Sequence, residues 1–190
     1  QLEKEQTIFK KERIRAERKI ATCQEEVEKA KRTEADFKRD LEYINSYNGA
    51  KATLLLNLPQ ASTEEVGREL HRIAKTYRNG AYGTVGTYAG LNLLVHSEYN
   101  MDGTFDRNTF FVEGISGLKY RCGRSGALPL GFVESAQYPH GALSKLPSLI
   151  EKQQKAVERI ESEIPTLQKI VCRQWSKTDE LSRFKQECKE

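Results

Sequence analysis

The sequence predicts an α+β protein in which a long antiparallel helical stalk, formed by both ends of the chain, carries a small β-α-β-β-β-β antiparallel-sheet domain. Three observations predict this fold class. The first 44 positions carry a heptad repeat, the middle alternates short apolar segments with glycine-containing turns, and the region after residue 143 returns to a helical period. The expected domains are an N-terminal coiled-coil arm at 1–47, a sheet domain at 48–142 and a C-terminal coiled-coil arm at 143–190.

The N-terminal arm has apolar or small residues at a spacing of seven, which is typical of a helix that buries a narrow seam against another helix. No Pro or Gly interrupts the arm before Asn48-Gly49. We therefore expect one helix about 65 Å long, at 1.5 Å per residue. The positions at this spacing are Leu2, Phe9, Ala16, Cys23, Ala30, Phe37 and Ile44, and the intermediate positions include Ile20, Val27, Glu34 and Leu41.

The sheet domain is expected to begin with a buried strand within 52–58, followed by a helix that starts with a capping box. The Ser62 side chain would accept a hydrogen bond from the backbone of Glu65, and the Glu65 side chain would accept one from the backbone of Ser62. Val66, Leu70 and Ile73 then share one face of that helix, which ends before 79–80. Four alternating segments follow, and we expect them to be antiparallel strands joined by hairpins, at 84–88, 91–99, 109–113 and 118–122.

The C-terminal arm carries apolar residues from Leu146 to Val171 at helical spacing. One arm enters the sheet domain and the other leaves it, so we expect the arms to pair in antiparallel fashion. Pro165 lacks a backbone donor and predicts a kink, and a short terminal helix is expected from about Thr178. Because the N-terminal arm outreaches the unkinked part of its partner, we expect its first turns to be available to a neighbouring domain or a second copy. Those turns carry Leu2, Phe9 and Ala16.

Charge, apolar content and cysteine spacing argue against strongly basic, membrane-spanning and cysteine-ligated metal-binding proteins. The net charge is +4, and basic and acidic groups are nearly balanced along the chain, so electrostatics alone does not predict nucleic-acid binding. No run of about 18 apolar residues is present. The four cysteines form no Cys-x-x-Cys pair, which favours reduced thiols, a cytoplasmic setting and no metal site or cofactor. The sequence begins at Gln1 and ends within a helical pattern, which favours a segment of a longer polypeptide.

No catalytic motif is found. The glycines within 82–90 match neither of two nucleotide-binding patterns, the Gly-x-Gly-x-x-Gly pattern and the Walker lysine loop. The segment 98–106 loosely resembles a calcium loop, but Thr109 stands where the bidentate Glu is needed, so a hairpin turn is the favoured interpretation. His140 is expected to lie in a loop.

Two groups of cations are candidate nucleic-acid contacts. Lys119, Arg121 and Arg124 lie near Tyr120, and a strand there would place Lys119 and Arg121 on one face. Tyr88, Tyr99 or Phe111 could stack on bases beside them. The second group lies on the N-terminal arm and contains Lys10, Lys11, Arg15 and Arg18. In both cases the alternative is an ordinary solvated face.

The order of segments from about residue 50 onward resembles the C-terminal region of large Swi/Snf-like helicase and adenine-specific DNA methylase fusion proteins of bacterial mobile elements. The resemblance is carried by Tyr88–Leu93, Phe110–Gly114, Leu118–Cys122, Leu146–Ile150 and Gln174–Lys177. The chain departs from that pattern at 134–141 and at Trp175-Ser176, and it contains neither a Walker lysine loop nor a methylase motif. The resemblance therefore implies an accessory region, with catalysis in flanking helicase or methylase domains.

From these observations we expect a non-catalytic accessory module that positions or contacts DNA for catalytic domains elsewhere in a parent chain. The alternative is a protein–protein interaction or oligomerisation module that acts through the helical stalk. The near-neutral charge of each segment favours that alternative.

Overall fold

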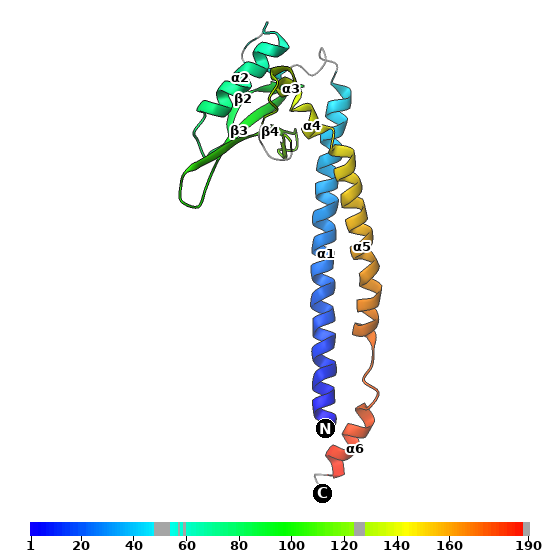
Figure 1. The fold of residues 1–190 in the computed structure, drawn as a ribbon. Helices are drawn as coiled ribbons and strands as arrows, with labels where there is room; N and C mark the ends of the chain where they lie inside the picture. The colour runs from blue at the N-terminus through cyan, green and yellow to red at the C-terminus, as the bar shows by residue number, and fades with distance from the viewer. Residues whose placement is uncertain (48–53, 57, 59, 124–127, 188–190) are drawn as a thin grey trace. The chain divides into compact units, whose positions relative to one another are not determined.

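The computed structural model describes residues 1–47, 54–56, 58, 60–123 and 128–187 (Figure 1). The chain divides into two compact units. The helical unit contains Gln1–Thr33 and Lys152–Glu190, and the sheet unit contains Glu34–Glu151. The division falls within the two longest helices, α1 (Leu2–Ser46) and α5 (Leu146–Cys172), whereas the sequence placed the domain boundaries near 47 and 143.

The helical unit pairs the first part of α1 with the later part of α5 in antiparallel fashion, as expected. Its core is formed by Cys23, Val27 and Ala30 of α1 with Val157 and Ile160 of α5. These α1 residues are heptad positions, so the repeat identified the buried stripe. An ion pair of 2.9 Å between Lys31 Nζ and Glu161 Oε1 lies beside this core.

The ends of α1, α5 and α6 can be compared with the ends that the sequence predicts. Helix α1 ends at Ser46, as predicted, and Asn48-Gly49 lies outside the described residues. Pro165 lies inside α5, which continues to Cys172, and the kink expected there stays a prediction. Helix α6 (Thr178–Glu187) is the expected short terminal helix.

The sheet unit contains, among its described residues, one antiparallel sheet of five strands in chain order. This order confirms the predicted β-α-β-β-β-β arrangement. Within the predicted strand at 52–58, Leu54–Leu55 form strand β1, and residues 52, 53 and 57 lie outside the described residues. The strands are β1 (Leu54–Leu55), β2 (Gly83–Tyr88), β3 (Leu91–Tyr99), β4 (Phe105–Glu113) and β5 (Lys119–Arg121).

The β3–β4 turn explains the resemblance of 98–106 to a calcium loop. Asp102 Oδ1 accepts hydrogen bonds from the backbone N–H and the hydroxyl of Thr104, at 2.9 and 2.6 Å. Gly103 has a φ of 81°, which a glycine adopts without strain. The polar side chains thus hold a tight hairpin, and β4 begins at Phe105, four residues earlier than expected.

Helices cover one face of the sheet (Figure 1). Helix α2 (Thr63–Thr76) has the predicted capping box and buries Val66, Leu70 and Ile73. Two further short helices, α3 (Phe132–Gln137) and α4 (His140–Leu143), were not expected.

His140 is not a loop residue, contrary to expectation, because it begins α4. Its Nδ1 lies 3.1 Å from the hydroxyl of Tyr88, which links α4 to β2.

Candidate nucleic-acid interface

The predicted alternation of β5 is confirmed. Tyr120 is buried, whereas the side chains of Lys119 and Arg121 are partly exposed. Both cations already have acidic partners. Lys119 Nζ lies 3.2 Å from Glu113, and Arg121 Nη2 lies 3.2 Å from Glu98. Arg124, the third predicted cation of this group, lies outside the described residues.

The open face of the sheet is therefore balanced in charge. Arg107 on β4 pairs with Asp106 at 2.8 Å and with Glu98 at 3.5 Å. A hydrogen bond from Asn92 and the contact with Lys119 lower the pKa of the Glu113 carboxyl, which favours its charged form. A phosphate that approached Lys119 or Arg121 would compete with these carboxylates.

The aromatic residues of the sheet occupy different surroundings. Tyr88 is buried in the core, so the expectation that it could stack on bases is wrong. Tyr99 is exposed and packs edge-on against Phe105. Phe111 is half-buried beneath the ring of Tyr82, with ring centroids 5.3 Å apart.

Tyr82 is a residue of the open face that the sequence did not single out. Its ring lies 4.9 Å from the ring of His96, and Lys119 Nζ lies 5.2 Å from the Tyr82 centroid. Phe111, His96 and Lys119 all contact the ring, although Tyr82 remains 48% exposed. Residues 79–81 show no alternation of apolar and polar side chains, so the sequence did not indicate that Tyr82 lies on the open face.

The cations of α1 have fewer partners. Lys10, Lys11, Arg15 and Arg18 are all exposed, and none of them forms an ion pair with another described residue. Arg13, the neighbouring cation, pairs with Glu17 at 3.1 Å.

Three of these α1 cations share one face. Lys11, Arg15 and Arg18 stand at i, i+4 and i+7, and Lys4 extends the row by one heptad. We call Lys4, Lys11, Arg15 and Arg18 the basic face of α1. It is turned away from the buried seam, and it extends about 21 Å at 1.5 Å per residue. The spacing of seven from Lys11 could have identified Lys4.

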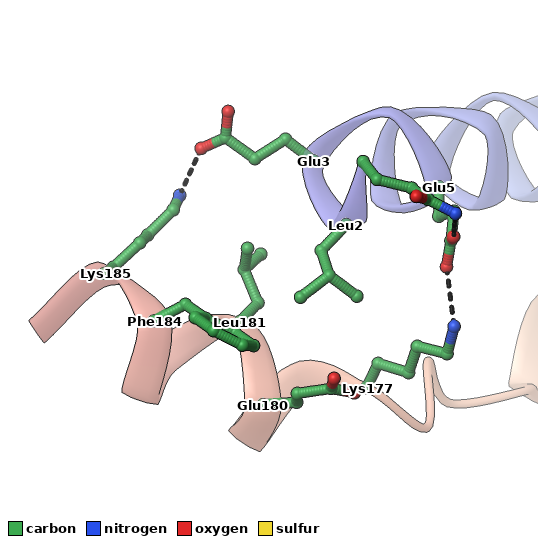
Figure 2. A pocket seen from close by; sticks show the side chains of 9 residues that line it. Leu2, Glu3, Glu5, Lys177, Glu180, Leu181, Phe184 and Lys185 are labelled. Carbon is green, nitrogen blue, oxygen red and sulfur yellow. Dashed lines mark hydrogen bonds and ion pairs between the residues drawn. The ribbon is translucent and has the colours of Figure 1, made fainter. Parts of the chain in front are cut away.

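The first turns of α1 lie beside α6 and enclose a groove of about 880 Å³ (Figure 2). Leu2 and Leu181 point toward one another across it. Lys177 Nζ lies 2.8 Å from Glu5 Oε2 and lowers the pKa of the Glu5 carboxyl, chiefly by hydrogen bonding. Ala16, the third residue expected to serve a partner, is buried. Self-association through these turns would therefore have to accommodate α6.

The most buried carboxyl among the described residues is that of Asp40, near the end of α1. It accepts hydrogen bonds from the backbone N–H of Ser116 at 2.8 Å and from the hydroxyls of Ser116 and Tyr120, each at 2.5 Å. Three donors therefore meet at one buried carboxyl, and this group stabilises the attachment of α1 to the β4–β5 turn. It contains no arrangement of nucleophile and base.

No three His, Cys, Asp or Glu side chains among the described residues are grouped as metal ligands would be. None of the described helices combines the length and apolar character needed to cross a bilayer.

A search of curated proteins and a search of solved structures each found no significant match. A family model described as a domain of unknown function, DUF8438, matches residues 38–143, which is more than half of the chain. The match contains all five described strands, helices α2, α3 and α4, and the cluster of Asp40, Ser116 and Tyr120, and it excludes the basic face of α1. The chain belongs to the DUF8438 family.

Proposed function

We propose that this chain is a non-catalytic accessory module of a DNA-processing protein, and that it contacts the DNA backbone through the basic face of α1. The observation that carries the proposal is the row of Lys4, Lys11, Arg15 and Arg18, which are exposed and have no acidic partner among the described residues. Phosphate contacts supply most of the sequence-independent affinity of proteins for DNA. The resemblance to helicase and methylase fusion proteins supports the wider setting.

The basic face suits a phosphate backbone better than the sheet cations do. The carboxylates of Glu113 and Glu98 offset the charges of Lys119 and Arg121, so the sheet presents less net positive charge to a phosphate than α1 does. The cations of α1 would release only water and counterions, and release of counterions from DNA favours binding. A helix can also lie along a groove or across a backbone without rearrangement.

The test is the salt dependence of binding to a fluorescein-labelled 20-base-pair duplex, measured by anisotropy between 25 and 200 mM NaCl. Lys11→Gln combined with Arg18→Gln removes two charges from the basic face. We expect weaker binding and a slope of log K against log salt that is shallower by about 1.8, at about 0.9 per phosphate contact.

Two matched controls remove the same charge elsewhere. Arg13→Gln with Lys19→Gln changes other faces of α1, and Lys119→Gln with Arg121→Gln changes the sheet. Both controls should keep the slope of the unmodified chain. Equal losses in all three variants would mean that only net charge matters, and an absence of binding at 25 mM salt would refute the DNA contact.

A second candidate function is protein–protein interaction through the stalk, and it is favoured by exposed apolar side chains on α1. Ile8 and Ile14 are 57% and 46% exposed, and burial of such large apolar side chains in an interface would be favourable. Ile8→Gln with Ile14→Gln should abolish any concentration-dependent increase in sedimentation coefficient. A chain that sediments as a monomer at all concentrations would exclude self-association.

A further inference from the structure

Strand β5 is the last strand of the sheet, so one of its edges has no strand partner among the described residues. The β4–β5 hydrogen bonds show which residues face that edge. Leu118 C=O accepts from Gly114 N–H at 2.8 Å, and Cys122 N–H donates to Phe110 C=O at 2.9 Å. Backbone groups alternate in direction along a strand. The N–H and C=O groups of Lys119 and Arg121 therefore point away from β4, toward the free edge.

A groove of about 380 Å³ lies beside this edge within the sheet unit. Its apolar lining includes Phe37, Tyr120 and Leu149, and its cations are Lys119, Arg121 and Lys145. No carboxylate of a described residue lines the groove itself, although Glu113 and Glu98 contact two of its cations. An edge with no strand partner among the described residues, an apolar groove and cations therefore meet at one place.

We propose that the β5 edge binds an extended acidic peptide segment by strand addition. An added strand would pair its backbone with Lys119 and Arg121, and its side chains would alternate between the two faces of the sheet. The residues opposite Lys119 and Arg121 would be acidic, and the residue opposite Tyr120 would be apolar and enter the groove. The recognised pattern is acidic-apolar-acidic. This inference is independent of DNA binding by α1.

The charge of the edge selects among possible occupants. Pairing of two β5 edges from two copies would bring Lys119 and Arg121 of both chains together, and like charges across neighbouring strands are destabilising. An acidic segment has the opposite effect. The acidic residues of the peptide would compete with Glu113 and Glu98 for these cations. Partly exposed pairs contribute at most about 1 kcal/mol, and the backbone hydrogen bonds of an added strand would hold the competing residues in place.

The first experiment compares labelled peptides that differ only in charge. The probes are fluorescein-Thr-Asp-Leu-Asp-Thr-amide and its counterpart with Lys at both Asp positions, each titrated with the 190-residue protein. We expect the acidic peptide to bind at least tenfold more tightly. Replacement of the peptide Leu by Ser should weaken binding at least tenfold, because the groove loses its apolar occupant. Equal binding of the acidic and basic peptides would overturn the proposal.

Exchanging charges on the protein provides a reciprocal test. Lys119→Glu with Arg121→Glu should reverse the preference, so that the Lys peptide binds better than the Asp peptide. Arg107→Glu on the neighbouring strand β4 is the control and should retain the original preference. A double variant that still prefers the acidic peptide would contradict the proposed register.

Backbone pairing is tested by amide hydrogen exchange, which leaves the protein unmodified. The amides of Lys119 and Arg121 should exchange rapidly in the free protein and at least tenfold more slowly when the acidic peptide is saturating. The amide of Tyr120, which faces β4, should be slow in both states. Unchanged exchange at Lys119 and Arg121, or protection by a thymidine oligonucleotide in place of the peptide, would refute strand addition.

Discussion

The hydroxyl of Tyr120 on β5 donates a hydrogen bond of 2.5 Å to the carboxylate of Asp40 on α1, across 80 positions of sequence. Asp40 is completely buried, and Ser116 supplies its remaining donors. Burial, followed by the bond to Asp40, raises the pKa of the Tyr120 hydroxyl, so this group stays a donor. The contact fixes the end of α1 to the β4–β5 hairpin, the element that carries Lys119 and Arg121.

Removing the carboxyl should be more costly than removing the hydroxyl. Asp40→Ala leaves the Ser116 N–H and the Tyr120 hydroxyl without their acceptor, and we expect a loss of about 3 kcal/mol in the free energy of unfolding. Tyr120→Phe removes one of three donors and should cost about 2 kcal/mol. Urea unfolding of both variants and of the double variant measures the coupling. Tyr120→Phe should cost almost nothing once Asp40 is absent, and strictly additive losses would contradict the network.

Gly67 allows α2 and α3 to pack at close range. A Cβ at this position would overlap the backbone of Phe132, which cannot move as a side chain can. In a helix interior Ala is otherwise favoured over Gly by about 1 kcal/mol. We expect the overlap to dominate, so Gly67→Ala should destabilise the protein by about 2 kcal/mol in urea unfolding. Gly141→Ala in α4 is the matched control, because nothing lies within 4 Å of its added Cβ. That variant should be neutral or slightly stabilising.

The capping box of α2 should contribute measurably to stability. Ser62 N–H donates to Glu65 at 2.7 Å, and Glu65 N–H donates to the Ser62 hydroxyl at 3.3 Å. Ser62→Ala should cost about 1 kcal/mol, and Ser62→Gly only a few tenths. The backbone bond from Ser62 lowers the pKa of the Glu65 carboxyl, so its contribution is present above its usual pKa of 4.5 and is lost as the pH falls below that value. Because Ser62→Ala keeps this backbone N–H, the pH dependence is tested with Glu65→Ala, which should cost less in urea unfolding at pH 3 than at pH 7.

Sequence periodicity predicted the elements whose signals are local. The heptads predicted the buried positions Cys23, Val27 and Ala30, and the capping box placed the start of α2. Alternation predicted β3 from Leu91 to Tyr99 and the orientation of Lys119 and Arg121. Each of these features depends on residues within a few positions of one another, and the sequence displays such spacing directly.

The features that sequence analysis missed depend on distant contacts. Helices α3 and α4 are too short for a helical period to be recognised, and they form where α2 and the sheet cover them. Asp40 stands beside the apolar heptad positions as an ordinary polar residue, and only Ser116 and Tyr120 reveal that it is buried. The acidic partners of Lys119 and Arg121 follow from strand register, which no local pattern specifies.

Alkaline pH should weaken the fold through Cys122. This thiol is completely buried, and burial raises its pKa from 9.0 to about 12. Between these values the unfolded chain loses a proton that the folded chain keeps. The contribution is fully present below pH 9 and is lost as the pH rises toward 12, by about 1.4 kcal/mol per pH unit. The raised pKa values of Tyr88 and Tyr120 act in the same direction.

The measurement is the slope of unfolding free energy against pH, from urea titrations at pH 8.5, 9.5 and 10.5. Cys122→Ala leaves a small cavity and so lowers stability at every pH, but it should make the slope shallower by about one proton. Cys172→Ala is the matched control, because Cys172 is exposed and its thiol contacts water before and after unfolding. A slope that is the same in both variants would mean that Cys122 is in contact with water in the folded protein, and the core of the sheet unit would then have to be packed differently around β5.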